Sequence, residues 1–169
     1  MSYLVRWGEE KIAELESRCR EQGLPLTLQR RVILEDLAGR CDHPTADQIY
    51  EAVTARFQGI SRTTVYRVLE TFVQLGVAQK ISNPEAKARF DADTRRHHHV
   101  VCLGCNRVID FAGEHLGDLA IPAEMADGFT VVNYSLTVTG FCACCRGQIS
   151  SGTLQASPGS RSLTKRRQV

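Results

Sequence analysis

Four stretches in the first half of the chain repeat apolar residues at the spacing of an amphipathic helix. They cover residues 9–22, 28–38, 44–57 and 62–75. A glycine lies within two residues of the end of each stretch, which predicts where each helix stops. Thr45 with Gln48 forms a capping-box pattern, and Ser61 stands where an N-cap is expected. The pattern predicts four consecutive short helices.

The period then changes from helical to alternating. Residues 77–82 and 87–91 alternate apolar and polar side chains around Asn83-Pro84-Glu85-Ala86, a sequence typical of a turn. Helices followed directly by such a hairpin predict a winged helix-turn-helix over about residues 9–93.

The remainder of the chain mixes both periods. Strands are expected at residues 97–102 and 107–111, a helix near 114–127, and a strand along 129–141. The fold class is therefore α+β, with a winged helix-turn-helix followed by a small α/β domain. The expected division is residues 1–92, 93–149 and a disordered tail, 150–169, whose end is basic.

Composition changes this picture little. The 169 residues are 43% hydrophobic and 24% charged, typical of a globular protein. No apolar run approaches the roughly 20 residues of a membrane span, and no signal peptide opens the chain, so a cytoplasmic protein is expected. A net charge of +2 does not by itself indicate DNA, and seven cysteines, an odd number, argue against a disulfide framework.

The fourth predicted helix carries the first candidate for chemistry. One face is apolar, while the other presents Arg62, Thr63, Tyr66 and Arg67. Arginine can hold phosphate or a guanine edge, and Tyr or Thr can contact a thymine methyl group. A merely solvated polar face would look similar, but the hairpin that follows favours DNA because a wing lies against the adjacent backbone.

Two Cys-x-x-Cys pairs predict a metal site. Cys102 and Cys105 are separated by 36 residues from Cys142 and Cys145, and four thiolates from two such pairs suit tetrahedral zinc. A complete thiolate shell leaves no open position, so this zinc is expected to be structural. Cys144 leaves the register of the second pair open, and we expect it to be the spare thiol.

Three consecutive histidines precede the first cysteine pair. In a strand, His97 and His99 share one face, while His98 shares the other with Cys102. Asp91 ends the second strand of the hairpin and Asp110 lies near the end of the strand after the first cysteine pair, so both can approach these histidines. His43, at the start of the third helix, could reach them from the winged helix.

Taken in order, these motifs resemble the ferric uptake regulator family. The matching stretches are LTLQRRVILEDL, HPTADQIYEAV, SRTTVYRVLETFVQLG, ARFD, HHHVVCLGC, VIDF and CACC, spread over roughly residues 9–146. The resemblance implies a homodimeric, metal-dependent transcriptional repressor that binds pseudo-palindromic operator DNA. It also implies that the protein is not an enzyme and has no small organic substrate.

Within that family the sequence is most similar to the peroxide-responsive repressors. The resemblance places their regulatory ligands on the residues His43, Asp91, His97, His99 and Asp110. Nitrogen and oxygen ligands without thiolate suit Fe²⁺ or Mn²⁺, and in this branch peroxide damage falls on the histidines at positions 43 and 97. Leu28 replaces a family proline, and Tyr134 stands where a further metal site needs histidine.

Three other functions are alternatives to that of a peroxide-responsive repressor. An iron- or other divalent-metal-responsive uptake regulator of the same family is the main alternative, because the iron-uptake branch differs mainly by glutamate at positions 91 and 110. A cysteine-ligated electron carrier would not need a winged helix. A zinc hydrolase or deaminase would need a pattern such as H-x-E before P-C-x-x-C, which the sequence lacks.

Overall fold

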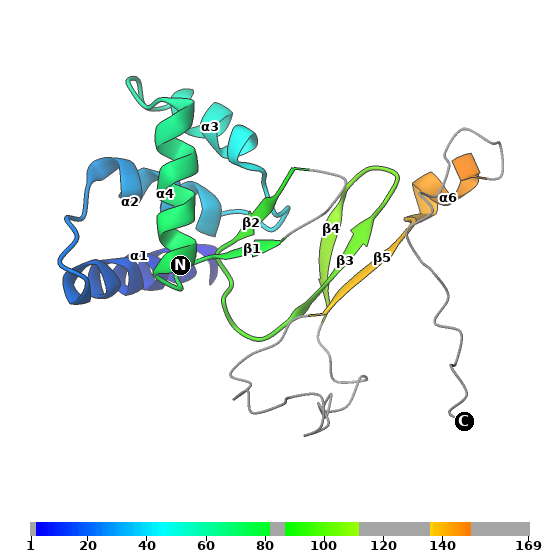
Figure 1. Ribbon diagram of the computed structural model, residues 1–169, viewed down its shortest axis with the longest axis horizontal. Coiled ribbons are helices and arrows are strands. Elements are labelled where there is room, and N and C mark those ends of the chain that lie inside the picture. The colour runs from blue at the N-terminus through cyan, green and yellow to red at the C-terminus, as the bar shows by residue number, and fades with distance from the viewer. Residues whose placement is uncertain (1–2, 82–86, 112–135, 150–169) are drawn as a thin grey trace, which may run out of the picture.

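The computed structural model describes residues 3–81, 87–111 and 136–149. Over these residues, four helices precede a hairpin, a three-stranded sheet and a short last helix (Figure 1). The helices are α1 (Tyr3–Glu21), α2 (Leu28–Ala38), α3 (Ala46–Thr54), α4 (Arg62–Gln74) and α6 (Ala143–Ile149). The strands are β1 (Gln79–Ile81), β2 (Arg89–Asp91), β3 (His98–Cys102), β4 (Val108–Phe111) and β5 (Thr137–Gly140). The expected α+β class is confirmed.

The first four helices and the hairpin share one hydrophobic core. Leu15, Ile33, Ile49 and Leu69 contribute one fully buried side chain from each helix, and Phe90 of β2 is 2% exposed. Burying side chains of this size contributes about 1.5–3 kcal/mol each. This core fixes the position of the hairpin against the helices.

Local capping sets the helix boundaries, as expected. Thr45 Oγ1 accepts a hydrogen bond from the Gln48 amide at 3.3 Å, and Gln48 Oε1 accepts one from the Thr45 amide at 2.8 Å. Ser61 Oγ accepts from the Thr64 amide at 3.1 Å and so caps α4. At the other end of α4, Gly76 adopts a φ of 69°, which glycine tolerates without strain.

The first helix begins six residues before its predicted start at residue 9. Its added turns include Trp7, which packs against the core. The Arg95 guanidinium carbon lies 4.9 Å from the centre of the Trp7 ring. This contact comes from a residue far along the chain, so helical spacing alone could not predict it.

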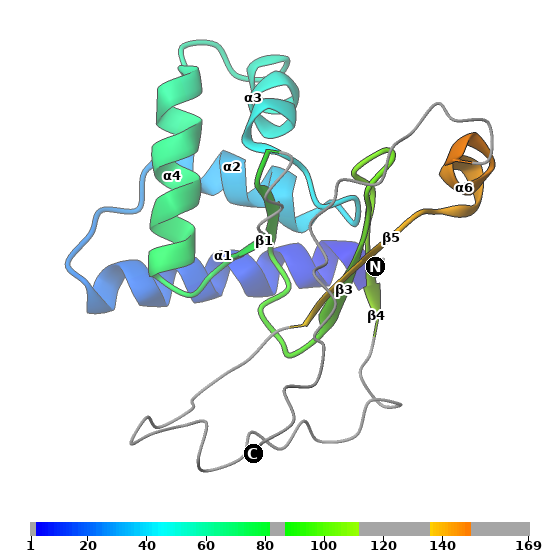
Figure 2. The ribbon, with the colours of Figure 1, turned by 45° about the vertical axis from the view of Figure 1, so that its right-hand side comes forward.

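The expected hairpin is present as the antiparallel pair β1–β2, with Gln79 opposite Asp91 and Ile81 opposite Arg89. The predicted turn at 83–86 lies outside the described residues. In both views the hairpin lies between the helices and the second sheet (Figures 1 and 2). β2 therefore carries its last residue, Asp91, toward that sheet.

In the second sheet β3 is central, antiparallel to β4 and parallel to β5. β5 lies within the strand expected at 129–141. The expected helix at 114–127, residues 129–135 and the tail lie outside the described residues. Helix α6 was not predicted. No helix among the described residues is both long and apolar enough to cross a membrane.

Candidate metal centres and DNA-facing surface

His97 and His99 point to the same side of the strand that begins at His98. Their Nε2 atoms lie 2.9 Å apart, with ring centres 4.5 Å apart. His98 points away from them: its Nδ1 accepts a hydrogen bond from the Leu136 amide at 3.3 Å, and its ring lies 5.4 Å from that of Phe111. The alternation expected from the sequence is thus present in the structure.

Two carboxylates from neighbouring strands meet these imidazoles. Asp91 Oδ2, at the end of β2, lies 3.0 Å from His97 Nε2 and 3.7 Å from His99 Nε2. Asp110 is directly opposite His99 in the β3–β4 pairing, and its Oδ1 lies 3.5 Å from both Nε2 atoms.

His43 reaches the same cluster from the loop before α3. Its Nε2 lies 2.7 Å from Asp110 Oδ1 and 3.7 Å from Asp91 Oδ2, and the side chain is 3% exposed. Arg89 Nη1 donates to the His43 carbonyl at 2.7 Å, and the Phe90 amide donates to the Pro44 carbonyl at 2.9 Å. The hairpin therefore holds this loop in place.

The backbone of His43 is strained. Its φ of 49° lies in the left-handed region, which costs a non-glycine residue about 1–3 kcal/mol. Its Nδ1 is buried and has no hydrogen-bond partner among the described residues. Strained residues of this kind are held in place by the surrounding structure and cluster at functional sites. At His43 this backbone conformation directs Nε2 into the cluster.

Hydrogen bonds prepare the other ligand atoms. His97 Nδ1 lies 2.8 Å from the Arg95 carbonyl, an arrangement in which Nδ1–H donates and Nε2 keeps a free lone pair. Burial opposes ionisation of Asp91. The hydrogen bond from His99, the Asp93 amide and the neighbouring imidazoles outweigh burial and hold the pKa of Asp91 below its usual value.

Sequence reasoning missed Gln79 of β1. Its side-chain Nε2 donates to the Asp93 carbonyl and lies 3.4 Å from Asp91 Oδ2 and 3.2 Å from His97 Nε2. The amide thus joins the winged helix, one carboxylate and one imidazole. A partner of this kind orients metal ligands and tunes their affinity. Only its alternation with Lys80 hinted that this side chain faces inward.

The predicted five-residue set is brought together. One ligand atom from each of His43, Asp91, His97, His99 and Asp110 lies within 4.8 Å of every other. Three imidazole nitrogens and two carboxylate oxygens suit a divalent first-row metal. The donors and their separations fit a single ion.

The predicted cysteines form a second cluster at the other end of β3. Cys102, Cys105, Cys142 and Cys145 place their sulfurs within 4.8 Å of one another. The Cys142 amide donates to Cys102 Sγ at 3.2 Å, and Cys105 Sγ lies 3.9 Å from Cys142 Sγ. Cys144 is exposed and outside this cluster.

The thiols of this cluster differ in acidity. Burial opposes ionisation of Cys102, but amides of Cys142, Cys105 and Gly104 outweigh it and lower its pKa to about 6. The hydrogen bond with Cys142, followed by burial, raises the pKa of Cys145 to about 12. Four thiolates this close would repel one another without a cation among them, and a metal that binds here would displace the protons of the thiols.

The four predicted DNA-binding residues are exposed on α4. Tyr66 is 40% exposed, and Tyr66 and Arg67 line a groove of ≈ 550 Å³ between α4 and the start of α2. Thr63 is open to solvent. Arg62 differs because it forms an ion pair with Asp47 of α3, a residue that sequence reasoning did not single out.

The chain is similar to proteins of known family. The model of the Ferric uptake regulator family matches residues 21–139. A peroxide-responsive repressor of Staphylococcus aureus is 33% identical over 146 residues, which is 86% of this chain and 99% of that protein.

Among solved structures, the Vibrio cholerae ferric uptake regulator is 32% identical with a TM-score of 0.61, covering 75% of this chain and 98% of that one. The Helicobacter pylori ferric uptake regulator, at 18% identity and a TM-score of 0.71, shares the fold over 82% of this chain and 93% of its own.

Proposed function

The chain belongs to the ferric uptake regulator family and is a metal-responsive transcriptional regulator, and we propose that the signal it answers is peroxide. In this proposal the histidine and aspartate cluster is a regulatory site for Fe²⁺ or Mn²⁺, and the cysteine cluster holds a structural Zn²⁺. Residues 1–92 form the DNA-binding domain, with Arg62, Thr63, Tyr66 and Arg67 facing the operator. Residues 93–149 form the dimerisation domain.

One observation carries the proposal: the thiolates and the nitrogen and oxygen ligands are segregated. The regulatory cluster contains no sulfur, while the four clustered cysteines lie together at the far end of β3. Thiolates select zinc, whereas imidazole and carboxylate accept Fe²⁺ and Mn²⁺. The 33% identity to a peroxide-responsive repressor over nearly its whole length supports the same assignment.

The cluster can also link metal to DNA binding. His43 and Asp91 come from the winged helix, whereas His99 and Asp110 come from the second sheet and His97 immediately precedes β3. Holding all five together fixes the angle between the two parts. In a dimer, that angle sets the spacing of two recognition helices on an operator.

Bound Fe²⁺ supplies one-electron chemistry with peroxide that Mn²⁺ does not readily supply. His43 and His97 keep their Nε2 atoms within the cluster and are the expected targets. The balanced change adds one oxygen atom to an imidazole, which loses two electrons overall while hydrogen peroxide is reduced to water. The oxidised ring would be a poorer ligand, so the metal would no longer fix the angle between the two parts of the chain.

A metal-responsive uptake regulator is the second candidate. The Vibrio cholerae ferric uptake regulator, 32% identical over 98% of its length, favours it. The two candidates differ in what peroxide does. An uptake regulator loses affinity for DNA only when its metal is removed. A peroxide sensor also loses affinity for DNA when peroxide is added, even though iron is still supplied.

The test is operator binding titrated with Mn²⁺, Fe²⁺ and Zn²⁺, with and without hydrogen peroxide. We expect Mn²⁺ and Fe²⁺ to support binding and peroxide to release only the iron-loaded protein. Mass spectrometry should then find one added oxygen on peptides containing His43 or His97.

Exposed thiols offer a competing route, since Cys41 and Cys144 are open to solvent. A thiol reductant restores oxidised cysteine but not an oxidised imidazole. Release that is reversed by reductant, with no histidine adduct, would contradict peroxide sensing through the metal and leave the uptake regulator.

A further inference from the structure

Asp47 joins cations from two other elements of the winged helix. It lies in the first turn of α3 and forms ion pairs with Arg62, the first residue of α4, and with Lys87, just before β2. These partners lie 15 and 40 residues away along the chain. The Asp47 side chain is 16% exposed, whereas Arg62 and Lys87 are 53% and 71% exposed.

A second contact restrains Arg62. Its guanidinium carbon lies 4.6 Å from the centre of the Tyr50 ring on α3, a cation–π distance. Arg62 is therefore held against α3 by a carboxylate and an aromatic face. Unlike Arg67, it is not free to extend from α4 toward a ligand.

The Asp47 cluster lies beside the proposed reading face. Lys87 Nζ donates a hydrogen bond to Asp47 Oδ2, and this bond together with the Asp47 charge raises the pKa of Lys87. Arg62 and Tyr66 lie four residues apart on the same face of α4, and Asp47, which pairs with Arg62, also holds Lys87 of the hairpin. A DNA backbone lying along α4 and the hairpin passes near Asp47.

The charge balance here disfavours phosphate. Two exposed cations and the positive N-terminal end of α3 form a surface suited to a DNA phosphate. Asp47 occupies that surface, cancels one of the two positive charges and competes with phosphate for both cations.

We propose that Asp47 restrains binding to the DNA backbone. By holding Arg62 and Lys87, it lowers affinity for every duplex alike, so stable binding depends on the base contacts of Tyr66 and Arg67. This inference rests on the proposed role of α4. It explains how a regulator of this kind avoids binding non-operator DNA through electrostatics alone.

The test compares Asp47→Asn with the native full-length, Mn²⁺-loaded protein. The probes are a duplex selected from a random library by the native protein and a scrambled duplex of the same composition. Fluorescence anisotropy is measured across a series of salt concentrations. We expect affinity for the scrambled duplex to rise at least about threefold, and the slope of log K against log salt to steepen by about 0.9 per added phosphate contact.

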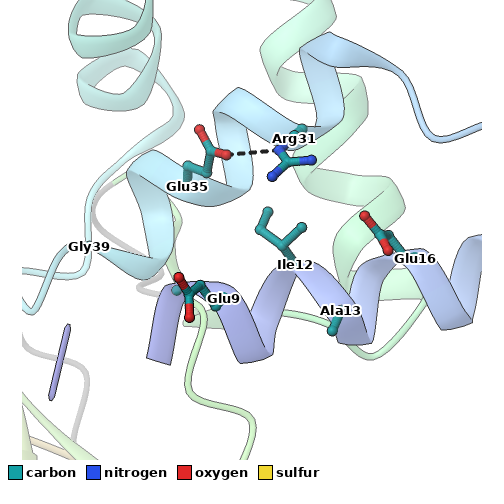
Figure 3. A pocket seen from close by; sticks show the side chains of 8 residues that line it. Glu9, Ile12, Ala13, Glu16, Arg31, Glu35 and Gly39 are labelled. Atoms are coloured by element: carbon teal, nitrogen blue, oxygen red, sulfur yellow. Dashed lines mark hydrogen bonds and ion pairs between the residues drawn. The ribbon is translucent and has the colours of Figure 1, made fainter. Parts of the chain in front are cut away.

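Three further variants make the result specific. Asp47→Glu keeps the charge and should behave as the native protein does. Adding Arg62→Ala to Asp47→Asn should remove much of the gain. Glu35→Gln deletes the same charge from an exposed pair with Arg31, in the groove of ≈ 360 Å³ between α1 and α2 (Figure 3), and should change neither affinity nor slope.

Two outcomes overturn the inference. One is an Asp47→Asn protein with unchanged affinity for both duplexes; the other is one that binds the selected duplex more weakly, which would make Asp47 a support for base reading. Tyr66→Ala and Arg67→Ala, run in the same assay, separate this from failure of the proposed function. If neither weakens the selected complex, the role proposed for α4 is wrong, whatever Asp47→Asn does.

Discussion

Replacing Gln79 by leucine removes the amide that contacts the regulatory cluster while nearly keeping its volume. The lost interactions are the hydrogen bond to the Asp93 carbonyl and a longer one, 3.4 Å, to Asp91 Oδ2. Neither is needed for the core, because Gln79 is only partly buried. The change therefore tests the positioning of metal ligands rather than the stability of the fold.

The expected size follows from those contacts. A hydrogen bond to a charged group contributes about 1.5–3 kcal/mol, and one at the long end of the range contributes less, about 1 kcal/mol. Since 1.4 kcal/mol corresponds to about tenfold in an equilibrium constant, Mn²⁺ affinity should fall about five- to tenfold. Mutation of residues that orient metal ligands typically lowers metal affinity about 10- to 100-fold. The loss expected for Gln79→Leu therefore lies at or just below the lower end of that range.

Two measurements are needed. Calorimetric titration with Mn²⁺ in the absence of DNA gives the metal affinity directly, and operator binding at saturating Mn²⁺ shows whether the loaded protein is intact. Gln22→Leu, at an exposed glutamine just after α1, is the matched control. A metal affinity within twofold of native, or an equal loss in the control, would refute the positioning role of Gln79.

Two further predictions concern the other proposed sites. Cys145→Ser should lose zinc, measured by metal analysis after gel filtration, while Cys144→Ser keeps it because that thiol lies outside the cluster; the reverse pattern would show that the ligand register is wrong. Tyr66→Ala and Arg67→Ala should each weaken operator binding by about 1–3 kcal/mol per lost base contact without changing metal content. If fluorescence anisotropy shows that both variants bind the operator with native affinity, α4 is not the helix that reads the bases.

Local signals in the sequence were sufficient for much of the fold. The Thr45–Gln48 capping box and the Ser61 cap involve residues three apart, so the chain encodes them directly. The same is true of His97, just before β3, and His99 within it, which point to one side as the strand period of two predicts. The grouping of cysteines and histidines into two clusters was also predictable, because each residue lies at or near the end of a predicted element.

Contacts between distant segments could not be predicted in this way. Gln79 reaches the metal cluster only because β1 pairs with β2, which places it opposite Asp91. The Asp47 ion pairs span 15 and 40 residues, and neither sequence spacing nor charge pattern marks them. The pattern correctly placed Arg62 on the exposed face of α4, but could not reveal that α3 holds its charge.

A single strand connects the two proposed metal sites. The pairing of β3 that puts His99 opposite Asp110 also puts Cys102 opposite Gly140, two residues before Cys142. A slip of one residue would turn His99 away from its cluster and Cys102 away from the thiols, because alternate residues face opposite sides.

Zinc held between Cys102 and Cys142, as proposed, would therefore fix the register of β3 against β5, and through β3 the position of His99. The reverse dependence is weaker, because His43 and Asp91 belong to the winged helix and do not hold the sheet together. Removing zinc should thus abolish regulatory metal binding. Removing the regulatory metal should leave zinc in place, because only the angle between the two parts of the chain is then released.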